Sequence, residues 1–276
     1  MTLNTGSGES TCWADLRLGD CLDIMPTLAP GSVDMVLTDP PYGTTACKWD
    51  SVIPFAPMWA GIKHCAKKNA AIVMTASQPF TSALAMSRMR EFRYCWVWDK
   101  CVASGFNYAR FQPMRQHEDI LVFYEDAPIY DATGEQYKKP IRYKMAHSAS
   151  DSSKMKHSRI GQYAIATHMK KRSILRFQKV RKGLHPTQKP IELMEYLIKT
   201  YTNPGDTVLD FTMGSGTTGV ACKRLGRNFI GIELDPGYFE VAKKRITEVD
   251  TPNSLFGRTP PQDGVDGKPP NAGGVP

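Results

Sequence analysis

The sequence predicts an α/β fold in which a mostly parallel sheet is covered by helices on both faces. Short apolar runs alternate with segments of helical apolar spacing, and only one long basic segment interrupts this alternation. Two loops marked by proline or glycine follow such apolar runs, which is where open α/β sheets place their ligands. Apolar side chains make up 41% of the 276 residues, enough for a packed core of one large or two small domains.

The alternation begins in the N-terminal half of the chain. Residues 33–38 form a short apolar run that ends in Asp-Pro-Pro-Tyr, which is typical of a buried strand followed by a loop. Residues 54–68 start with proline and carry apolar residues at helical spacing, so they predict a helix. The other elements expected here are a strand at 71–75, a helix at 80–89, and aromatic or β-branched strands at 93–98 and 119–124.

The alternation resumes after the basic segment. Residues 190–200 predict a helix, because a proline occupies its first turn. The elements expected beyond it are a strand at 206–210, a helix at 217–225, a strand at 229–232 and a helix at 238–249. Residues 251–276 contain six prolines and five glycines but few apolar groups, which predicts a disordered tail.

The basic segment spans residues 138–182. It contains 14 lysines and arginines and a single acidic residue, Asp151, for a net charge of +13, whereas the whole chain has a net charge of +8. A block of this size favours a polyanion partner, because binding phosphates releases counterions. A solvated loop that only aids solubility is the alternative. The candidate phosphate contacts are Lys138, Lys139, Arg142, Lys144, Lys170, Lys171, Arg172 and Arg176.

Several classes of protein are not expected from these features. No run of 18 apolar residues is present, so neither a membrane span nor a membrane partner is expected. The first ten residues lack the basic and apolar regions of a signal peptide. The seven cysteines never form CxxC, which favours free thiols in the cytoplasm and argues against a zinc site, so no metal is expected.

A glycine-rich loop follows the strand expected at 206–210. Gly214, Gly216 and Gly219 match G-x-G-x-x-G, and Glu233 follows 19 positions after Gly214. The glycines let the backbone approach a ligand, and the carboxylate accepts hydrogen bonds from ribose hydroxyls. The pattern therefore predicts an adenosine-containing cofactor, with NAD still open and a tight turn without ligand as the alternative. A P-loop is excluded because the lysine of GK[ST] is missing.

A second loop, Asp39-Pro40-Pro41-Tyr42, follows the strand expected at 33–38. Its two prolines fix φ and remove two N–H donors, so the turn is stiff and presents carbonyl oxygens. A carboxylate, a carbonyl and an aromatic ring are thereby directed at one point. A planar base with an exocyclic amine fits this set, because both amine protons find acceptors and the ring finds a stacking face. A proline turn whose aspartate caps the backbone is the alternative.

In this order the motifs resemble the β-group DNA amino-methyltransferases, specifically the adenine enzymes. The resemblance covers about residues 15–249 and is carried by Leu18-Gly-Asp-Cys21, Thr38-Asp-Pro-Pro-Tyr-Gly43, Trp98-Asp-Lys100, His117-Glu118, His185-Pro-Thr-Gln-Lys-Pro190, residues 211–219 and Gly231-Ile-Glu-Leu-Asp235. It implies a Rossmann-like class I methyltransferase fold with a seven-stranded, circularly permuted sheet and a basic target-recognition insert. It also implies S-adenosylmethionine as methyl donor and double-stranded DNA as substrate.

The resemblance assigns roles to individual residues. Asp39 and the Pro40 carbonyl would accept the two N6 protons of a flipped-out adenine, and Tyr42 would stack on that base. Direct in-line methyl transfer would follow, aided by alignment of the reacting atoms. The residues expected at the cofactor are Asp20, Cys21, Asp39, His185, Thr187, Lys189, Asp210, Phe211, Gly214, Ser215, Gly216, Thr217, Thr218 and Glu233, with Lys189 facing its carboxylate.

The resemblance also suggests an organisation and partners. The segments are a flexible N-terminus (1–10), a catalytic half (11–100), the remaining strands with the basic insert (101–182), a cofactor-binding half (183–249) and a disordered tail (250–276). It allows a homodimer and a cognate restriction enzyme as partners, in the cytoplasm of a bacterial or phage-infected cell.

Three other functions stay open at this point. An N4-cytosine enzyme of the same architecture has a similar amine to methylate, although relatives acting on cytosine more often carry serine in place of Asp39. An NAD-linked dehydrogenase fits G-x-G-x-x-G and Glu233 but leaves the proline loop and the basic segment unexplained. A non-catalytic DNA-binding protein with a decayed cofactor site is the third.

Overall fold

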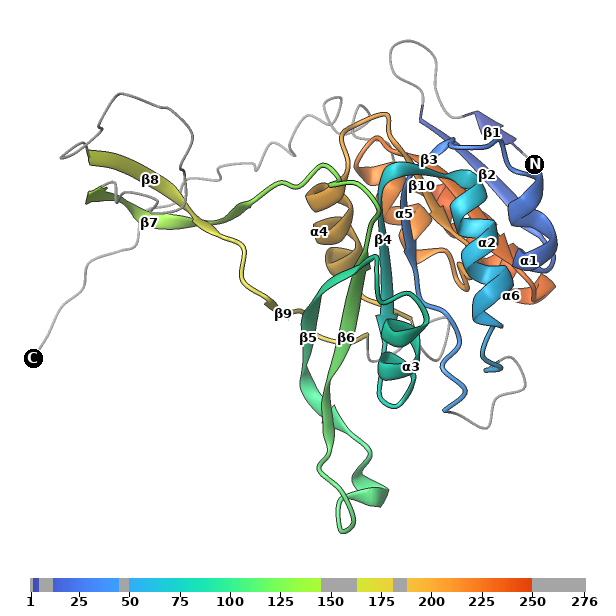
Figure 1. Ribbon diagram of the computed structural model, residues 1–276, viewed down its shortest axis with the longest axis horizontal. Helices are drawn as coiled ribbons and strands as arrows, with labels where there is room; N and C mark the ends of the chain where they lie inside the picture. The colour runs from blue at the N-terminus through green and yellow to red at the C-terminus, as the bar shows by residue number, and fades with distance from the viewer. Residues whose placement is uncertain (1, 5–11, 45–49, 145–162, 181–187, 250–276) are drawn as a thin grey trace, which may run out of the picture.

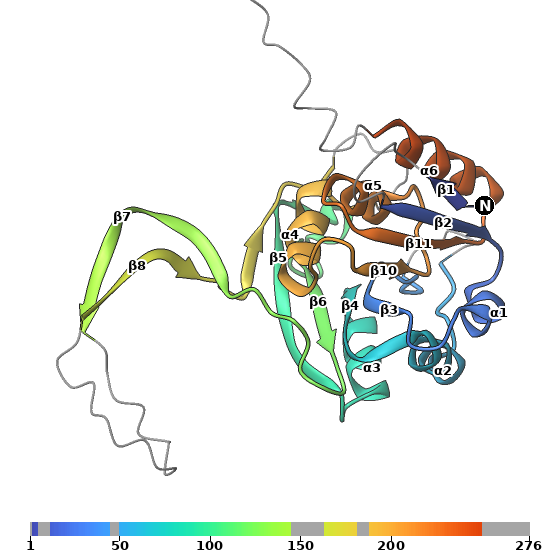
Figure 2. The same cartoon turned by 90° about the horizontal axis from the view of Figure 1, so that it is seen from above.

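The computed structural model describes residues 2–4, 12–44, 50–144, 163–180 and 188–249. They form a nine-stranded mixed sheet with helices on both faces, and a separate two-stranded hairpin that projects from the body (Figures 1 and 2). The strands of the main sheet are β1 (Thr2–Asn4), β2 (Trp13–Leu18), β3 (Val33–Thr38), β4 (Ala66–Ala76), β5 (Phe92–Ser104), β6 (Arg115–Phe123), β9 (Ile174–Arg176), β10 (Thr207–Asp210) and β11 (Asn228–Glu233).

Six α-helices are present among the described residues. They are α1 (Cys21–Ile24), α2 (Phe55–Cys65), α3 (Phe80–Ser87), α4 (Ile191–Tyr201), α5 (Thr217–Arg224) and α6 (Pro236–Glu248). Two 3-10 turns, η1 (Met25–Thr27) and η2 (Phe106–Tyr108), complete the body, and strands β7 (Thr133–Lys144) and β8 (Tyr163–Lys170) form the separate hairpin. Asp235 caps the N-terminus of α6, because its side chain accepts hydrogen bonds from the Gly237 and Tyr238 amides.

The strand order confirms the permuted Rossmann-like sheet. The order is β1-β2-β11-β10-β3-β4-β6-β5-β9, so the last two strands of the chain lie between β2 and β3. The seven strands from β2 to β5 are the expected set. The sheet is larger than predicted, because β1 and β9 add one short strand at each edge. It is also mixed, since β1 and β6 run antiparallel to their neighbours.

Two apolar cores hold helices on opposite faces of the sheet (Figure 2). Strand β3 contributes side chains to both cores, because successive side chains of a strand point to opposite faces of the sheet. Met35 and Leu37 pack in the core that includes α4, α5 and α6. Val36 packs in the other core, with residues of α1, α2 and α3. The parallel part of the sheet is thus covered on both sides, as its apolar strands predict.

Several element boundaries differ from those predicted. Helix α2 ends at Cys65, three residues early, because Ala66 pairs with Val33 and already belongs to β4. Strand β5 continues to Ser104, so the segment boundary placed at residue 100 falls inside a strand. No strand was predicted at β2, which is held in the sheet by parallel pairing with β11.

The basic segment contributes both a hairpin and a strand of the main sheet. Strands β7 and β8 pair antiparallel and reach away from the body (Figure 2). Strand β9 then returns to pair with β5. The N-terminal segment, apart from residues 2–4, and the tail predicted to be disordered lie outside the described residues.

Two further expectations concern cysteines and membranes. The six cysteines among the described residues are free thiols. Over the same part of the chain, no helix has the length and apolar character needed to cross a membrane.

Helix α4 is joined to β5 by a buried hydrogen bond. Trp96 Nε1 donates to the Tyr201 hydroxyl at 2.8 Å, and both side chains are almost fully buried. The same hydroxyl lies 2.9 Å from the Tyr94 hydroxyl. This contact joins α4, which precedes the glycine-rich loop in the chain, to β5, which lies on the side of β3 away from β10 in the sheet.

Replacing Tyr201 by phenylalanine is expected to destabilise the protein. The substitution leaves the buried Trp96 N–H without its acceptor, which costs about 1–3 kcal/mol of unfolding free energy. Urea unfolding checks this, with Tyr130→Phe as the matched control because the Tyr130 ring contacts Tyr201 but is 45% exposed. Equal stability of the two variants would contradict the role of this bond.

Candidate active site

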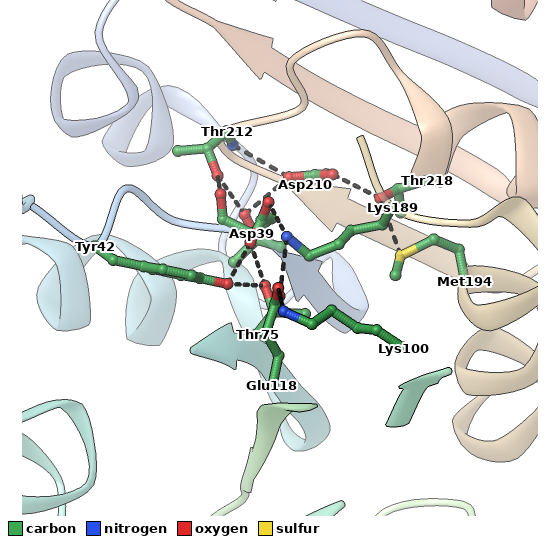
Figure 3. Close-up of polar contacts among 11 residues, drawn as sticks. Asp39, Tyr42, Thr75, Lys100, Glu118, Lys189, Met194, Asp210, Thr212 and Thr218 are labelled. Carbon is green, nitrogen blue, oxygen red and sulfur yellow. Dashed lines mark hydrogen bonds and ion pairs between the residues drawn. The ribbon is translucent and has the colours of Figure 1, made fainter. Parts of the chain in front are cut away.

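The proline loop and the glycine-rich loop meet because their strands are neighbours. Strands β3 and β10 pair in parallel, with Val36 opposite Leu209. The Thr38 hydroxyl, at the end of β3, donates to Asp210 Oδ1 at 2.8 Å. In return, the Thr212 hydroxyl donates to the Asp39 carbonyl at 3.2 Å (Figure 3). Residues more than 170 positions apart are thereby tied together at the carboxyl edge of the sheet.

One cavity of about 480 Å³ opens between these loops. Its wall includes the proline loop at one end and the turn after β2 with the end of β11 at the other. Of the residues named from the sequence, the lining ones are Asp20, Cys21, Asp39, Pro40, Pro41, Tyr42, Lys189, Asp210, Phe211, Gly214, Ser215, Thr217, Thr218 and Glu233. Residues from segments far apart in the chain therefore line one cavity.

Asp39 is held by three donors from three different segments. Its Oδ1 accepts hydrogen bonds from the Tyr42 hydroxyl at 2.6 Å and from the Thr75 hydroxyl at the end of β4. Its Oδ2 lies 2.5 Å from the Lys189 ammonium (Figure 3). A carboxylate offers about four lone-pair sites, so these contacts orient the group and leave a site on Oδ2 for another donor.

Lys189 belongs to a chain of alternating charges. Its Nζ lies 3.4 Å from Glu118 Oε2, and Glu118 Oε1 lies 3.3 Å from Lys100 Nζ. Burial alone would lower the pKa of Lys189, but the carboxylates of Asp39 and Glu118 raise it above its ordinary value. Lys189 therefore stays charged between the two carboxylates. That it faces a cofactor carboxylate stays a prediction.

The Tyr42 ring stacks on Phe80, with ring centroids 5.3 Å apart and planes 23° from parallel. The Lys189 Nζ lies 5.8 Å from the centroid of the same ring, and Tyr42 lines the cavity. Burial and the nearby carboxylates of Asp39 and Glu118 raise the pKa of the Tyr42 hydroxyl, so it remains a donor to Asp39.

The opposite end of the cavity is arranged around Glu233. Its Oε2 accepts a hydrogen bond from the Gly214 amide at 2.7 Å, and its Oε1 accepts one from the Asp235 amide at 2.8 Å. Burial raises the pKa of this carboxyl. Asp20 caps α1 by accepting from the Leu22 amide at 2.8 Å. The Cys21 thiol, whose burial raises its pKa to about 12, stays protonated.

Asp210 is a buried carboxyl, and the groups that donate hydrogen bonds to it are uncharged. It accepts from the hydroxyls of Thr218 at 2.6 Å and Thr38 at 2.8 Å, and from the Thr212 amide. Burial raises the pKa of Asp210 to about 6 in spite of these bonds. It serves to hold the two loops together.

Two of the motif glycines act in packing. A Cβ on Gly216, whose φ is +75°, would lie 2.9 Å from the Ala242 Cβ of α6, and a Cβ on Gly219 would overlap Ile246 and Phe229. Gly216 therefore permits the turn and the close approach of α6, and it is absent from the cavity lining. His185 and Thr187 lie outside the described residues.

The basic residues named from the sequence differ in accessibility. Lys138, Lys139, Arg142, Lys170, Arg172 and Arg176 are exposed. Lys171 differs from them, because its Nζ donates to Thr200 at 2.7 Å, lies 4.7 Å from the centroid of the Tyr196 ring, and belongs to a side chain only 3% exposed. The Lys144 side chain lies outside the described residues.

Three residues around Asp39 were not named as site residues from the sequence. Thr75, Lys100 and Glu118 come from β4, β5 and β6. Lys100 and Glu118 belong to two of the motifs that carry the resemblance, and Thr75 lies at the end of a predicted strand. Thr212 lies inside the glycine-rich loop and was given no role. In the part of the chain described, no group of three or more His, Cys, Asp or Glu side chains is arranged to hold a metal ion.

Comparison with known proteins agrees with this arrangement. A family model described as DNA methylase matches residues 33–244. The chain is 27% identical over 258 residues to the type II methyltransferase M1.MboII of Moraxella bovis, a match covering 84% of this chain and 95% of that protein.

Solved structures give the same result. The crystal structure of an M1.HpyAVI–SAM complex is 28% identical with a TM-score of 0.56, over 84% of this chain and 99% of that chain. The cytosine-N4-specific PvuII DNA methyltransferase reaches a TM-score of 0.63 at 16% identity, over 88% of this chain and 89% of that chain, which shows the fold alone.

The raised pKa of Asp210 predicts a specific pH dependence of stability. In the folded state the pKa is about 6, against an ordinary value of 3.8, so ionisation of this carboxyl costs stability as the pH rises through that interval. Relative to Asp210→Asn, the wild-type protein should lose about 3 kcal/mol of unfolding free energy between about pH 3 and about pH 7, most of it between about pH 4 and about pH 6. Urea unfolding at a series of pH values measures this difference, and a constant difference would rule out the raised pKa.

Proposed function

The chain belongs to the N6/N4 DNA methylase family, and on that premise we propose that it methylates the N6 amine of adenine in double-stranded DNA. The protein is a DNA methyltransferase that takes its methyl group from S-adenosylmethionine. The choice of an exocyclic amine rests on the Asp39 side chain, which pairs with Lys189 and lines the cavity next to Pro40.

The residues of the cavity fit S-adenosylmethionine. A volume of about 480 Å³ lies within the range of small-molecule sites. Residues of the adenosine-binding pattern and Asp39 line the same cavity. Glu233 would hold the ribose hydroxyls, and the turn at Asp20 and Cys21 would contact the adenine. When bound, this cofactor supplies a methyl group attached to a sulfonium centre.

Asp39 and Pro40 prepare the amine of the target base. The lone pair of an adenine amine is delocalised into the ring, which makes the nitrogen a poor nucleophile. Asp39 Oδ2, which keeps an acceptor site beside Lys189, and the Pro40 carbonyl each accept one amine proton. Bonds to both protons favour a pyramidal nitrogen and direct its lone pair away from the acceptors. The stiff proline turn fixes this geometry in advance, and alignment of this kind accounts for a large part of catalysis.

Tyr42 contacts the target base, and the basic hairpin contacts the DNA backbone. The Tyr42 ring, which is held by stacking on Phe80, stacks on the extruded base. A base inside a stacked duplex cannot reach this cavity, so the target nucleotide is flipped out. The exposed lysines of β7 and β8 supply contacts to the phosphates, which position the protein without reading the sequence.

Identification of the methylated nucleoside tests the proposed function. DNA is incubated with the protein and methyl-labelled S-adenosylmethionine and then digested to nucleosides. Label in N6-methyladenine supports adenine. Label in N4-methylcytosine instead assigns the N4 reaction, whose amine presents the same two protons to Asp39 and Pro40. Absence of label would refute methyl transfer by this chain.

Other expectations from the resemblance stay predictions. They are a homodimer, a cognate restriction enzyme, location in the cytoplasm, and the roles given to His185 and Thr187. The division into catalytic, recognition and cofactor-binding segments is likewise a prediction.

Asp39→Asn is expected to abolish most of the methyl transfer while cofactor binding persists. The amide is a weaker acceptor and cannot pair with Lys189, so kcat should fall by about 10²-fold or more. Calorimetry should show S-adenosylmethionine binding within a few-fold of wild type. Asp34→Asn, on the same strand but outside the cavity lining, is the matched control. Near-normal turnover of the Asp39 variant would remove this residue from the reaction.

Neutralising exposed lysines of the hairpin should weaken DNA binding and its salt dependence. Combining Lys138→Gln, Lys139→Gln and Lys170→Gln removes three phosphate contacts, each worth about 0.9 in the slope of log affinity against log salt. Lys171→Gln should leave that slope unchanged, because the structure buries this side chain against Thr200 and Tyr196. Binding isotherms at several salt concentrations measure both slopes. An unchanged slope for the triple variant would exclude the hairpin from the interface.

A further inference from the structure

Strands β5 and β6 continue past the end of the sheet as a projecting arm, here defined as residues 100–117. Strand β4 stops at Ala76, opposite Asp119 of β6, and β9 stops opposite Asp99 of β5. Beyond these points no other strand among the described residues pairs with the arm, and it extends away from the body (Figure 1). Because β5 runs parallel to β3 and β4, the arm leaves from the same edge of the sheet as Asp39.

The tip of the arm exposes aromatic side chains. Phe106 is 80% exposed, Phe111 is 74% exposed and Tyr108 is 61% exposed. Clustered exposed apolar groups of this size mark interaction surfaces. Rings that a protein does not bury in its own core are therefore candidates for contact with a partner.

The charge of the arm indicates the chemistry of that partner. Residues 101–117 contain Arg110 and Arg115 but no aspartate or glutamate. The Arg110 guanidinium lies over the Phe111 ring, 4.6 Å from its centroid. Aromatic rings combined with arginine and free of acidic groups suit a nucleic acid, whose bases stack on the rings and whose phosphates pair with the cations.

The base of the arm is connected to the proposed reaction site. Lys100 contacts Glu118 at 3.3 Å, and Glu118 contacts Lys189, which pairs with Asp39. The arm therefore begins at Lys100, which these ion pairs link to Asp39. Between Asp99 and Ser104 the ladder is irregular, with Cys101 at φ 60°, and Ser104 pairs with Arg115 before the chain reaches the tip.

We propose that the arm enters the target duplex beside the extruded nucleotide, with Phe106 and Phe111 stacking on the bases that lose their neighbour. The inference rests on the proposed function, since only a base that must leave the duplex creates such a gap. Extrusion costs unstacking free energy, and the rings at the tip offset part of that cost. The arm thus promotes base flipping, while the hairpin of β7 and β8 holds the backbone.

The test compares Phe106→Ala/Phe111→Ala with Met86→Ala/Ile174→Ala, a matched pair of exposed apolar side chains outside the arm. The methylated sequence is first read from DNA treated with the wild-type protein. Turnover is then measured on a paired duplex of that sequence and on one with the target base mispaired, which is cheaper to extrude. The arm variant should lose about tenfold or more on the paired duplex and recover most of this on the mispaired one, with an unchanged melting temperature. The control pair should match wild type on both.

Other results would overturn the inference. Full turnover of the arm variant on the paired duplex, or an equal loss on both duplexes, would show that the tip does not assist extrusion. A change of oligomeric state with unaltered turnover would assign the tip to an interface between copies of this chain. Failure of the proposed function is distinguishable, because the wild-type protein itself would then transfer no label.

Discussion

Parallel pairing of β3 with β10 is the constraint on which the site depends. Strands that run in parallel end at the same edge, so the loops that follow them must lie side by side. Here the two loops are the proline turn at Asp39 and the glycine-rich turn at Gly214, which are also linked through Thr38, Asp210 and Thr212. Because β10 is only four residues long and fully buried, a slip in its register would turn its apolar side chains toward the wrong core. Core packing and site geometry are therefore set by the same pairing.

Two carboxyls at this edge have different surroundings. Asp39 lines the cavity and is paired with a buried lysine, which also contacts a second carboxylate. Asp210 is buried, has hydroxyl and amide donors in place of a cation, and burial raises its pKa. The difference matches their positions. Asp39 keeps an acceptor site next to the substrate amine, whereas Asp210 links the two loops through its hydrogen bonds.

Two projections extend from one compact body, and their compositions differ. The hairpin of β7 and β8 carries exposed cations and reaches sideways (Figure 2). The arm formed by β5 and β6 carries exposed rings and leaves from the edge that holds the cavity (Figure 1). Phosphate contacts hold a protein on a duplex, while contacts to bases act on individual nucleotides. The division of charge and aromatic surface between the two projections corresponds to these two tasks.

The sequence by itself determined the alternation of strands and helices, the two loops and the family, because strand and helix periods, proline turns and glycine motifs are local properties of the chain. Tertiary structure alone decided which side chains surround Asp39. Thr75, Glu118 and Lys189 come from separate segments, and their convergence depends on strand order. It also decided that Lys171 is buried while Lys170 is exposed. A charge count treats the two neighbouring lysines alike. Their exposure differs because the chain after β8 packs against α4, and such contacts join residues distant in the sequence.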